Sequence, residues 1–273
     1  MKPVSEMTPA QVAGVKYVLT DIDDTLTNSG KLAASSYAAI WKLKEAGFKV
    51  IPVTGRPAGW CDCIVREWPV DGIVGENGAF AFWEEAEGAS AQPARLPTLR
   101  TMRHPNAARN DHPTLCKARE KVFAAVPGLR DAKDNFSRLF DIALDFAEEE
   151  PVLPFSAAEK ARDIALAEGA VAKISSIHVN VWMGDYDKLS MTELFLRERF
   201  GWQGDLSEAL FVGDSPNDEP MFARFPLACA VANIRRCQHL LKRLPAFVAT
   251  REGGEGFAEI AGKLLGESFS RGR

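Results

Sequence analysis

Two pairs of acidic residues directly follow apolar segments of the sequence. Asp21 and Asp23 come after one such segment near the start of the chain, and Asp214 and Asp218 come after another near its end. Carboxylates that share a site repel each other unless a cation is present, and oxygen ligands with few supporting His or Cys residues select Mg²⁺. A carboxylate can attack phosphorus to form an aspartyl-phosphate, while a second one protonates the leaving oxygen and later activates water. The acidic pairs therefore predict Mg²⁺-assisted phosphoryl chemistry.

A third polar group, Thr54 with Gly55 and Arg56, follows a further apolar segment. Ligands of open α/β sheets bind beyond the carboxyl ends of the strands, so we expect these groups to meet at one sheet edge. A single Asp at a strand end is more often a turn former or a helix cap, but four carboxylates after two strands disfavour that alternative. No GxGxxG fingerprint follows the first strand, and the sequence has no GxxxxGK[ST] phosphate loop.

Strand and helix patterns alternate at both ends of the chain, which predicts a parallel sheet with right-handed crossovers. Pro57 suits the first turn of a helix that Gly55 and Arg56 open. The other elements expected in the first part are strands at 15–20, 48–53 and 72–75 and a helix at 32–46. Those expected in the last part are helices at 188–200, 217–223 and 255–265 and strands at 209–213, 227–231 and 247–249.

The middle of the chain has a different pattern. Its long alternating segments, 138–147 and 172–183, are typical of antiparallel strands with one covered face. We further expect a hairpin of 79–83 with 92–99, a helix at 111–125, and a helix at 156–168 that begins with a capping box at Ser156. The expected fold is thus α/β, with a Rossmann-like parallel sheet core at 1–83 and 184–273 and an inserted α+β cap at 84–183.

Side chains alternate across a strand, so each face of the expected cap strands has its own composition. One face should pack on the cap helices and carries Phe140, Ile142, Leu144 and Phe146. The opposite face of the last cap strand carries His178, Asn180 and Trp182. That second face either roofs the active site, where it would bind hydroxyls or a sugar face, or is an ordinary solvated surface. No partner ligands are spaced with His178, which argues against a metal-binding role.

Composition narrows the classes of partner. The 273 residues include 33 Lys and Arg against 37 Asp and Glu, a net charge of −4 that argues against general nucleic-acid binding. The five cysteines suit reduced thiols in a reducing compartment. We see neither a signal peptide nor an apolar run long enough to span a membrane. We therefore expect a cytoplasmic protein without a membrane partner, and the sequence leaves the oligomeric state open.

Four segments resemble the motifs of haloacid dehalogenase-like (HAD) phosphatases. VLTDIDDTLT is similar to the first motif, DxDx[TV]; Thr54 in PVTGRP resembles the second, Lys188 in GDYDKLS the third, and VGDSPND the fourth. The resemblance spans about residues 15 to 231. The insertion follows Glu76-Asn77-Gly78-Ala79, between the second and third motifs, and so resembles the C2B-capped, Cof-like (type IIB) branch. Asp24 departs from the pattern, because Gly is common there.

The resemblance implies a role for each matched residue. Asp21 would be the nucleophile and an Mg²⁺ ligand, and Asp23 the general acid/base with its backbone carbonyl on the metal. Thr54 would hydrogen-bond the phosphoryl group, and Lys188 would neutralise the charges of Asp21 and the phosphate. Asp214 and Asp218 would complete the Mg²⁺ site. Lys173 is a rival to Lys188, but it starts a cap strand, whereas Lys188 follows the cap and opens a core helix.

The same resemblance implies a Mg²⁺-dependent phosphomonoesterase that acts on a small phosphorylated metabolite, a sugar or polyol phosphate, through an aspartyl-phosphate. A phosphomutase of the phosphomannomutase type and a non-catalytic binding protein on this fold are the alternatives. Gly55, Arg56, Asn77 and Asn217 are further candidates for substrate contacts. For Arg56 a cap–core salt bridge is the alternative role, and for Asn217 a turn or helix cap.

Overall fold

The computed structural model describes residues 1–85, 97–175 and 177–266. Its centre is a six-stranded sheet in the order β1-β15-β14-β13-β2-β5, and every neighbouring pair is parallel. The six strands are β1 (Lys2–Pro3), β2 (Tyr17–Thr20), β5 (Lys49–Pro52), β13 (Ala209–Gly213), β14 (Leu227–Ala230) and β15 (Phe247–Val248). The expected α/β fold with a parallel sheet is confirmed.

Helices cover both faces of this sheet. Successive side chains of each strand point to opposite sides, so both faces of the sheet carry apolar side chains that pack against helices. In β2, Val18 packs into one hydrophobic cluster and Leu19 into the other. The first cluster includes residues of α2 (Ala34–Glu45), α3 (Ala58–Glu67) and α8 (Gly253–Leu264), and the second includes residues of α6 (Lys188–Phe200) and α7 (Glu219–Arg224). Burial on both faces explains why the central strands β13 and β14 are apolar throughout.

The expected strand at 72–75 does not join the parallel sheet by a continuous ladder of hydrogen bonds. It forms β6 (Ile73–Gly75), which pairs antiparallel with β7 (Phe80–Glu85), and β7 pairs in turn with β8 (Thr98–Arg103). The reason is a reversal at Asn77, whose φ of 56° turns the chain directly after β6. One parallel bridge, Val53 to Val74, joins β6 to the core. Residues 92–96 of the expected hairpin lie outside the described residues.

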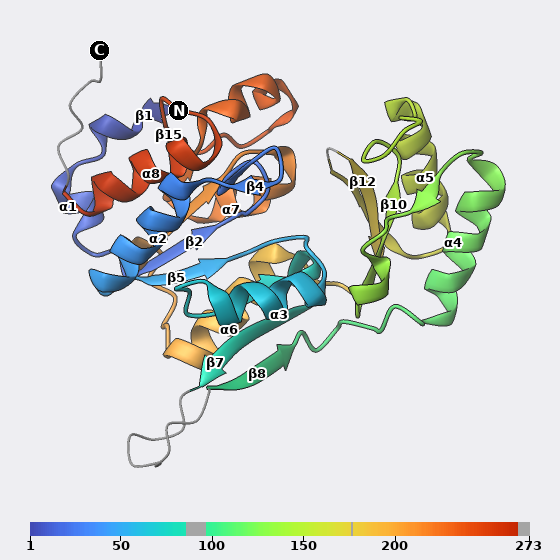
Figure 1. Cartoon of the computed structure of the whole chain (residues 1–273), viewed down its shortest axis with the longest axis horizontal. Helices are drawn as coiled ribbons and strands as arrows, with labels where there is room; N and C mark the ends of the chain where they lie inside the picture. The colour runs from blue at the N-terminus through green and yellow to red at the C-terminus, as the bar shows by residue number, and fades with distance from the viewer. Residues whose placement is uncertain (86–96, 176, 267–273) are drawn as a thin grey trace.

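The inserted region forms its own antiparallel sheet, in the order β11-β12-β10-β9 (Figure 1). Of the side chains expected to face the cap helices, Ile142, Leu144 and Phe146 do so, whereas Phe140 packs with the core cluster. The elements of this region are α4 (Pro113–Ala125), β9 (Arg130–Asp131), β10 (Asp141–Asp145), α5 (Phe155–Ala167), β11 (Val171–Ile174) and β12 (His178–Trp182).

Two sequence expectations in the cap are wrong. The segment 172–183 is not one strand but the antiparallel pair β11 and β12, and the Ser175 backbone N–H donates to the His178 carbonyl at 2.8 Å to close the turn. The apolar positions shift from even numbers before this turn to odd numbers after it, and that shift marks the reversal. Ser156 does not cap a helix either, because α5 begins at Phe155 and has Pro154 in the capping position.

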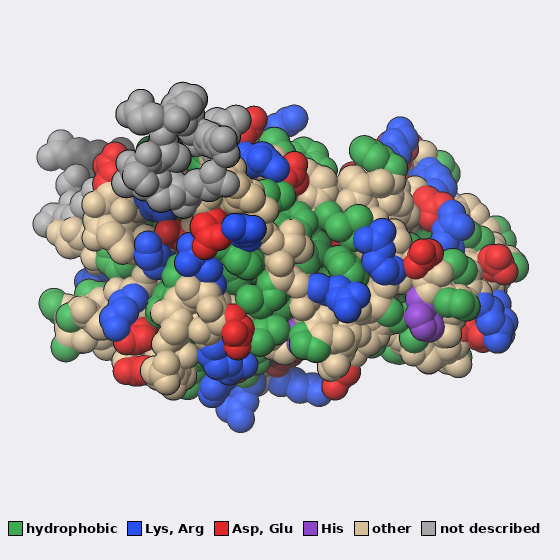
Figure 2. All heavy atoms as spheres, turned by 90° about the horizontal axis from the view of Figure 1, so that it is seen from below, with side chains coloured by type: hydrophobic (Ala, Val, Ile, Leu, Met, Phe, Trp, Pro, Cys, Tyr) green, Lys and Arg blue, Asp and Glu red, His purple; other side chains and the backbone are tan. Residues whose placement is uncertain are grey.

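The boundaries of core and cap at residues 84 and 183 stay a prediction. Because β8 pairs with β7 along its whole length, we propose that the cap begins after Arg103. The remaining elements are α1 (Pro9–Val12) and the small pair β3 (Thr27–Asn28) and β4 (Lys31–Leu32). No helix in the described parts of the chain is both long and apolar enough to cross a membrane. Figure 2 shows positive and negative side chains intermixed over the face seen from below.

Candidate active site

Three carboxylates meet at the carboxyl ends of two neighbouring strands. Because β2 and β13 pair in parallel, the chain brings Asp21 next to Asp214, and a short helical turn adds Asp218. Each residue offers one oxygen, and these oxygens all lie within 4.8 Å of one another. This set of hard oxygen donors fits Mg²⁺.

Lys188 supplies a cation to this cluster. It is the first residue of α6, where the Asp187 side chain caps the helix by accepting from the Ser190 backbone N–H at 2.8 Å. The buried Lys188 Nζ lies 2.7 Å from Asp21 Oδ1 and 2.9 Å from Asp218 Oδ1. Burial opposes the charge on Lys188, but the two carboxylates more than offset it and raise the pKa of this amine. The same ion pairs outweigh the unfavourable position of a cation at a helix N-terminus.

The three carboxylates carry more negative charge than the single positive charge of Lys188 can balance. Burial raises the pKa of Asp21 to about 7, with Lys188 opposing the shift and Asp218 adding to it. Burial, Asp218 and Asp21 together raise the pKa of Asp214 to about 9. A divalent cation would relieve this excess of negative charge, so the residues present fit the metal that the sequence predicts.

The backbone and nearby side chains hold the cluster in place. Asp218 Oδ2 accepts from the Asp214 backbone N–H at 3.1 Å, and a Cβ at Gly213 would overlap that oxygen. The two oxygens of Asp214 accept from the Thr25 hydroxyl at 3.2 Å and from Asn233 Nδ2 at 3.0 Å. Sequence reasoning missed Thr25 and Asn233, although the Thr of DxDx[TV] was a signal for the first.

Asp23 and Arg56 form a bidentate ion pair within the core. Arg56 Nη2 lies 2.7 Å from Asp23 Oδ1, and Arg56 Nε lies 3.1 Å from Asp23 Oδ2. The Asp23 side chain remains 55% exposed, while the guanidinium lies 4.8 Å from the centre of the Trp60 ring. The buried Thr54 accepts from the Arg56 backbone N–H at 3.1 Å. Arg56 therefore forms its ion pair within the core and not with the cap, and a different arginine donates a hydrogen bond from the cap to the core.

That arginine is Arg138, which joins the entrance of the cap to the core. Its Nη1 donates to the Gly55 carbonyl at 3.2 Å and to Asp141 Oδ1 at 2.9 Å. Asn77 Nδ2 donates to the other oxygen of Asp141 at 3.3 Å. A Cβ at Gly55 would lie 3.0 Å from Asn77 Oδ1, so the glycine makes room for this contact. Sequence reasoning missed Arg138 and Asp141 because the partners are distant along the chain.

The three candidates on β12 have different surroundings. His178 Nε2 lies 2.7 Å from Glu148 Oε2, a partner within the cap. Trp182 is fully buried, with its ring centre 5.7 Å from that of Tyr186. Asn180 is buried, and its Oδ1 has no hydrogen-bond partner among the described residues. Whether these side chains contact substrate stays a prediction.

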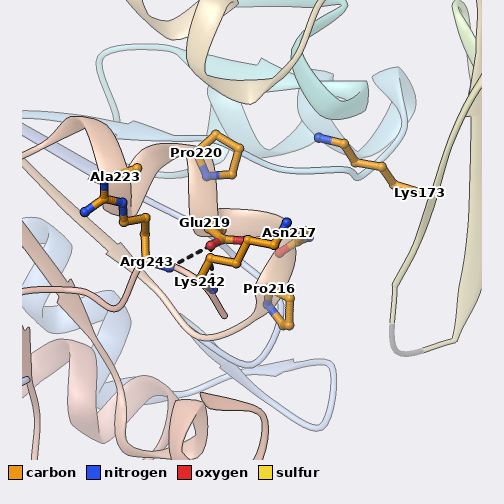
Figure 3. A pocket seen from close by; sticks show the side chains of 8 residues that line it. All are labelled: Lys173, Pro216, Asn217, Glu219, Pro220, Ala223, Lys242 and Arg243. Atoms are coloured by element: carbon orange, nitrogen blue, oxygen red, sulfur yellow. Dashed lines mark hydrogen bonds between the residues drawn. The ribbon is translucent and has the colours of Figure 1, made fainter. Parts of the chain in front are cut away.

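A cavity of about 510 Å³ lies next to the fourth motif and is lined from both core and cap. Asn217, between Asp214 and Asp218 in the sequence, is one of its lining residues, and the Ser215 hydroxyl donates to its Oδ1. Lys173 is the lining residue that comes from the cap, as Figure 3 shows. The full lining consists of Lys173, Pro216, Asn217, Glu219, Pro220, Ala223, Lys242 and Arg243.

The comparisons with known proteins agree with this geometry. Residues 18–121 match the family model described as haloacid dehalogenase-like hydrolase. No curated protein matches the chain. A Thermoplasma acidophilum protein is similar in structure at 19% identity and a TM-score of 0.69, covering 92% of this chain and 98% of its own. A Plasmodium vivax protein described as a HAD/COF-like hydrolase has 17% identity and a TM-score of 0.64, covering 93% and 96%.

A third similar structure is a HAD subclass IIB sugar phosphatase, with 14% identity, a TM-score of 0.60, and coverage of 92% of this chain and 99% of that one. These likenesses extend over nearly the whole chain, so they include the inserted cap as well as the core. The protein shares the fold of these structures, a parallel α/β core with an inserted cap. The part of the chain that holds the first two motifs, residues 18–121, is similar to haloacid dehalogenase-like hydrolases.

Proposed function

We propose that this hydrolase is a Mg²⁺-dependent phosphomonoesterase that acts on a small phosphorylated metabolite, a sugar or polyol phosphate. The observation that carries the proposal is the buried Asp21 carboxylate, which lies 2.7 Å from Lys188 Nζ and beside two further carboxylates. Likeness to a HAD subclass IIB sugar phosphatase supports the substrate class. The five cysteines are all free thiols, which suits a reducing compartment, and we propose a cytoplasmic location.

Asp21 is the nucleophile in this proposal. Its carboxylate oxygen attacks phosphorus, the ester oxygen leaves, and an aspartyl-phosphate forms on Asp21. Lys188 holds Asp21 in place and offsets the negative charge of the incoming phosphate, and the Thr54 hydroxyl binds a phosphoryl oxygen. When bound by Asp21, Asp214 and Asp218, Mg²⁺ supplies the positive charge that allows two anions to meet.

Asp23 is the general acid/base. It protonates the leaving oxygen in the first step and takes a proton from water in the second, when water attacks the aspartyl-phosphate. Its side chain is exposed enough to reach both groups, and the bidentate Arg56 fixes its orientation. The backbone carbonyl of Asp23 is a further candidate ligand for the metal.

Phosphate release from p-nitrophenyl phosphate and from a panel of sugar and polyol phosphates tests the proposal. We expect release with Mg²⁺, loss of release with EDTA, and loss of about 10³-fold or more in Asp21→Asn. Analysis of the products for isomers separates a phosphatase from a phosphomutase. Near-normal turnover in a folded Asp21→Asn protein would overturn the proposal.

A further inference from the structure

The cavity beside Asn217 is lined by lysines from two different parts of the molecule. Lys173 reaches it from β11 of the cap, and Lys242 reaches it from the core (Figure 3). Neither side chain forms an ion pair or a hydrogen bond with any residue that the structure describes. Two unpaired cations around one cavity are a typical arrangement for binding an anion.

Lys173 is the more constrained of the two. It is half-buried, and its Nζ lies 5.9 Å from the centre of the Trp182 ring. Burial lowers the pKa of Lys173, with the charge of Asp187 acting in the opposite direction. The charges of Lys188 and Asp218 also act on it, and its side chain lines the same cavity as Asn217. A half-buried ammonium that forms no direct ion pair is unfavourable, so a bound anion would stabilise it.

Hydrogen bonds to Glu219 hold the backbone at Lys242 in place. The Glu219 carboxylate accepts from the backbone N–H groups of Lys242 and Arg243, each at 2.7 Å. Figure 3 shows the Lys242 side chain directed toward Asn217, whereas the Arg243 side chain runs toward Ala223. The cation available to a ligand at Asn217 is therefore Lys242. The Glu219 carboxylate accepts both of these backbone N–H groups, so its Oε1 points toward the backbone of Lys242 and Arg243.

We propose that the preferred substrate carries a second anionic group, a carboxylate or a second phosphate, which lies in this cavity between Lys173 and Lys242. The inference rests on the proposed function, in which the ester phosphate lies at Asp21. The cavity suits it because its lining residue Asn217 lies in the sequence between Asp214 and Asp218, two residues of the carboxylate cluster. A lysine is a point charge and accepts either kind of anion.

Two pairs of substrates test the inference, because the members of each pair differ in the second group. 6-Phosphogluconate and sorbitol 6-phosphate differ in a carboxylate, and fructose 1,6-bisphosphate and fructose 6-phosphate differ in a phosphate. We expect wild-type kcat/KM to favour the anion-bearing member of at least one pair by about tenfold or more. The pair that shows the preference identifies the kind of anion.

Lys173→Met and Lys242→Met should each remove most of that preference, mainly by raising KM for the anion-bearing substrate. Lys160→Met is the matched control, since Lys160 lies on α5 and donates to the Ala125 carbonyl within the cap; it should keep the wild-type preference. Equal kcat/KM within both pairs, or a preference that survives in both variants, would overturn the inference while phosphate release still supports the proposed function. Absence of release from every ester, p-nitrophenyl phosphate included, would overturn both.

Discussion

The carboxylate of Glu76, on the core side, lies 2.6 Å from the backbone nitrogen of Phe140, where the chain enters β10 of the cap. The same carboxylate accepts from the N–H of Leu139 at 2.9 Å and from that of Asp141 at 3.2 Å. It also accepts from the N–H of Ala58, the first residue of α3, at 2.9 Å. One fully buried side chain thus fixes the end of the cap strand against the core.

Replacing Glu76 by Ala should therefore destabilise the protein. The change leaves four backbone N–H groups without their acceptor, and we expect a loss of about 3 kcal/mol or more in the free energy of unfolding. Chemical denaturation measures the loss, and hydrogen exchange should show faster exchange at residues 139–141. Glu85→Ala, which removes an exposed ion pair with Arg100, is the control and should cost less than about 1 kcal/mol. Equal stability of the two variants would contradict this role of Glu76.

Gly78 is needed for the position of Lys188. Its φ is 106°, and a Cβ there would overlap the carbonyl oxygen of Asp187 and lie 2.9 Å from the Lys188 backbone nitrogen. Gly78→Ala should therefore shift the first turn of α6 and lower kcat as well as stability. Gly169→Ala is the control, because Gly169 has a φ of 88° with open space around it. It should cost about 1–2 kcal/mol of stability and leave kcat unchanged. If both variants behaved alike, the predicted link to Lys188 would be wrong.

The pair of Arg56 and Asp23 predicts a specific kinetic effect. Because Arg56 orients the general acid/base, Arg56→Ala should lower kcat by about tenfold or more with a small change in KM. Arg56→Lys should recover only part of the loss, since Lys cannot form the bidentate pair. Steady-state kinetics on the best substrate measures both. A rise in KM at constant kcat would show instead that Arg56 binds the substrate anion.

The crowded carboxylates predict how stability depends on pH without metal. The pKa values of Asp21, about 7, and Asp214, about 9, lie above the 3.8 of an ordinary Asp, so the folded state binds more protons than the unfolded state. Stability should therefore fall as pH rises from about 4 to about 9. Calorimetry in EDTA should show a falling Tm, and Mg²⁺ should raise Tm more at about pH 9 than at about pH 5. Asp214→Asn should flatten the dependence, and a Tm that rises through this range in EDTA would contradict the account.

Sequence patterns predicted the core because its elements depend on local features. The strand at 209–213 and the helix at 188–200 have the predicted bounds, since one is uniformly apolar and the other begins at a capping Asp and ends at a glycine. These are properties that a short window of sequence contains. The three-carboxylate cluster then follows because such strands pair in parallel and their carboxyl ends meet at one edge of the sheet.

The missed features depend on partners that are distant along the chain. Glu76 meets Phe140 across 64 positions, and no local pattern distinguishes this buried acid from a surface one. Arg138 likewise finds Gly55 only after the cap has folded back onto the core. The turn that divides 172–183 into two strands has a local signal, because its apolar residues change from even to odd positions there. The alternation within each half is uninterrupted, so a search for alternation alone does not find the turn.

Trapping the phosphorylated enzyme tests the central claim, that Asp21 is the nucleophile. Wild-type protein is mixed with p-nitrophenyl phosphate and Mg²⁺, quenched during turnover and treated with borohydride, which reduces an aspartyl-phosphate to homoserine, and the peptides are then analysed by mass spectrometry. The account predicts homoserine at position 21, and none there in Asp21→Asn or without substrate. Modification at another residue, or phosphate release by wild type with no trapped species at position 21, would contradict it.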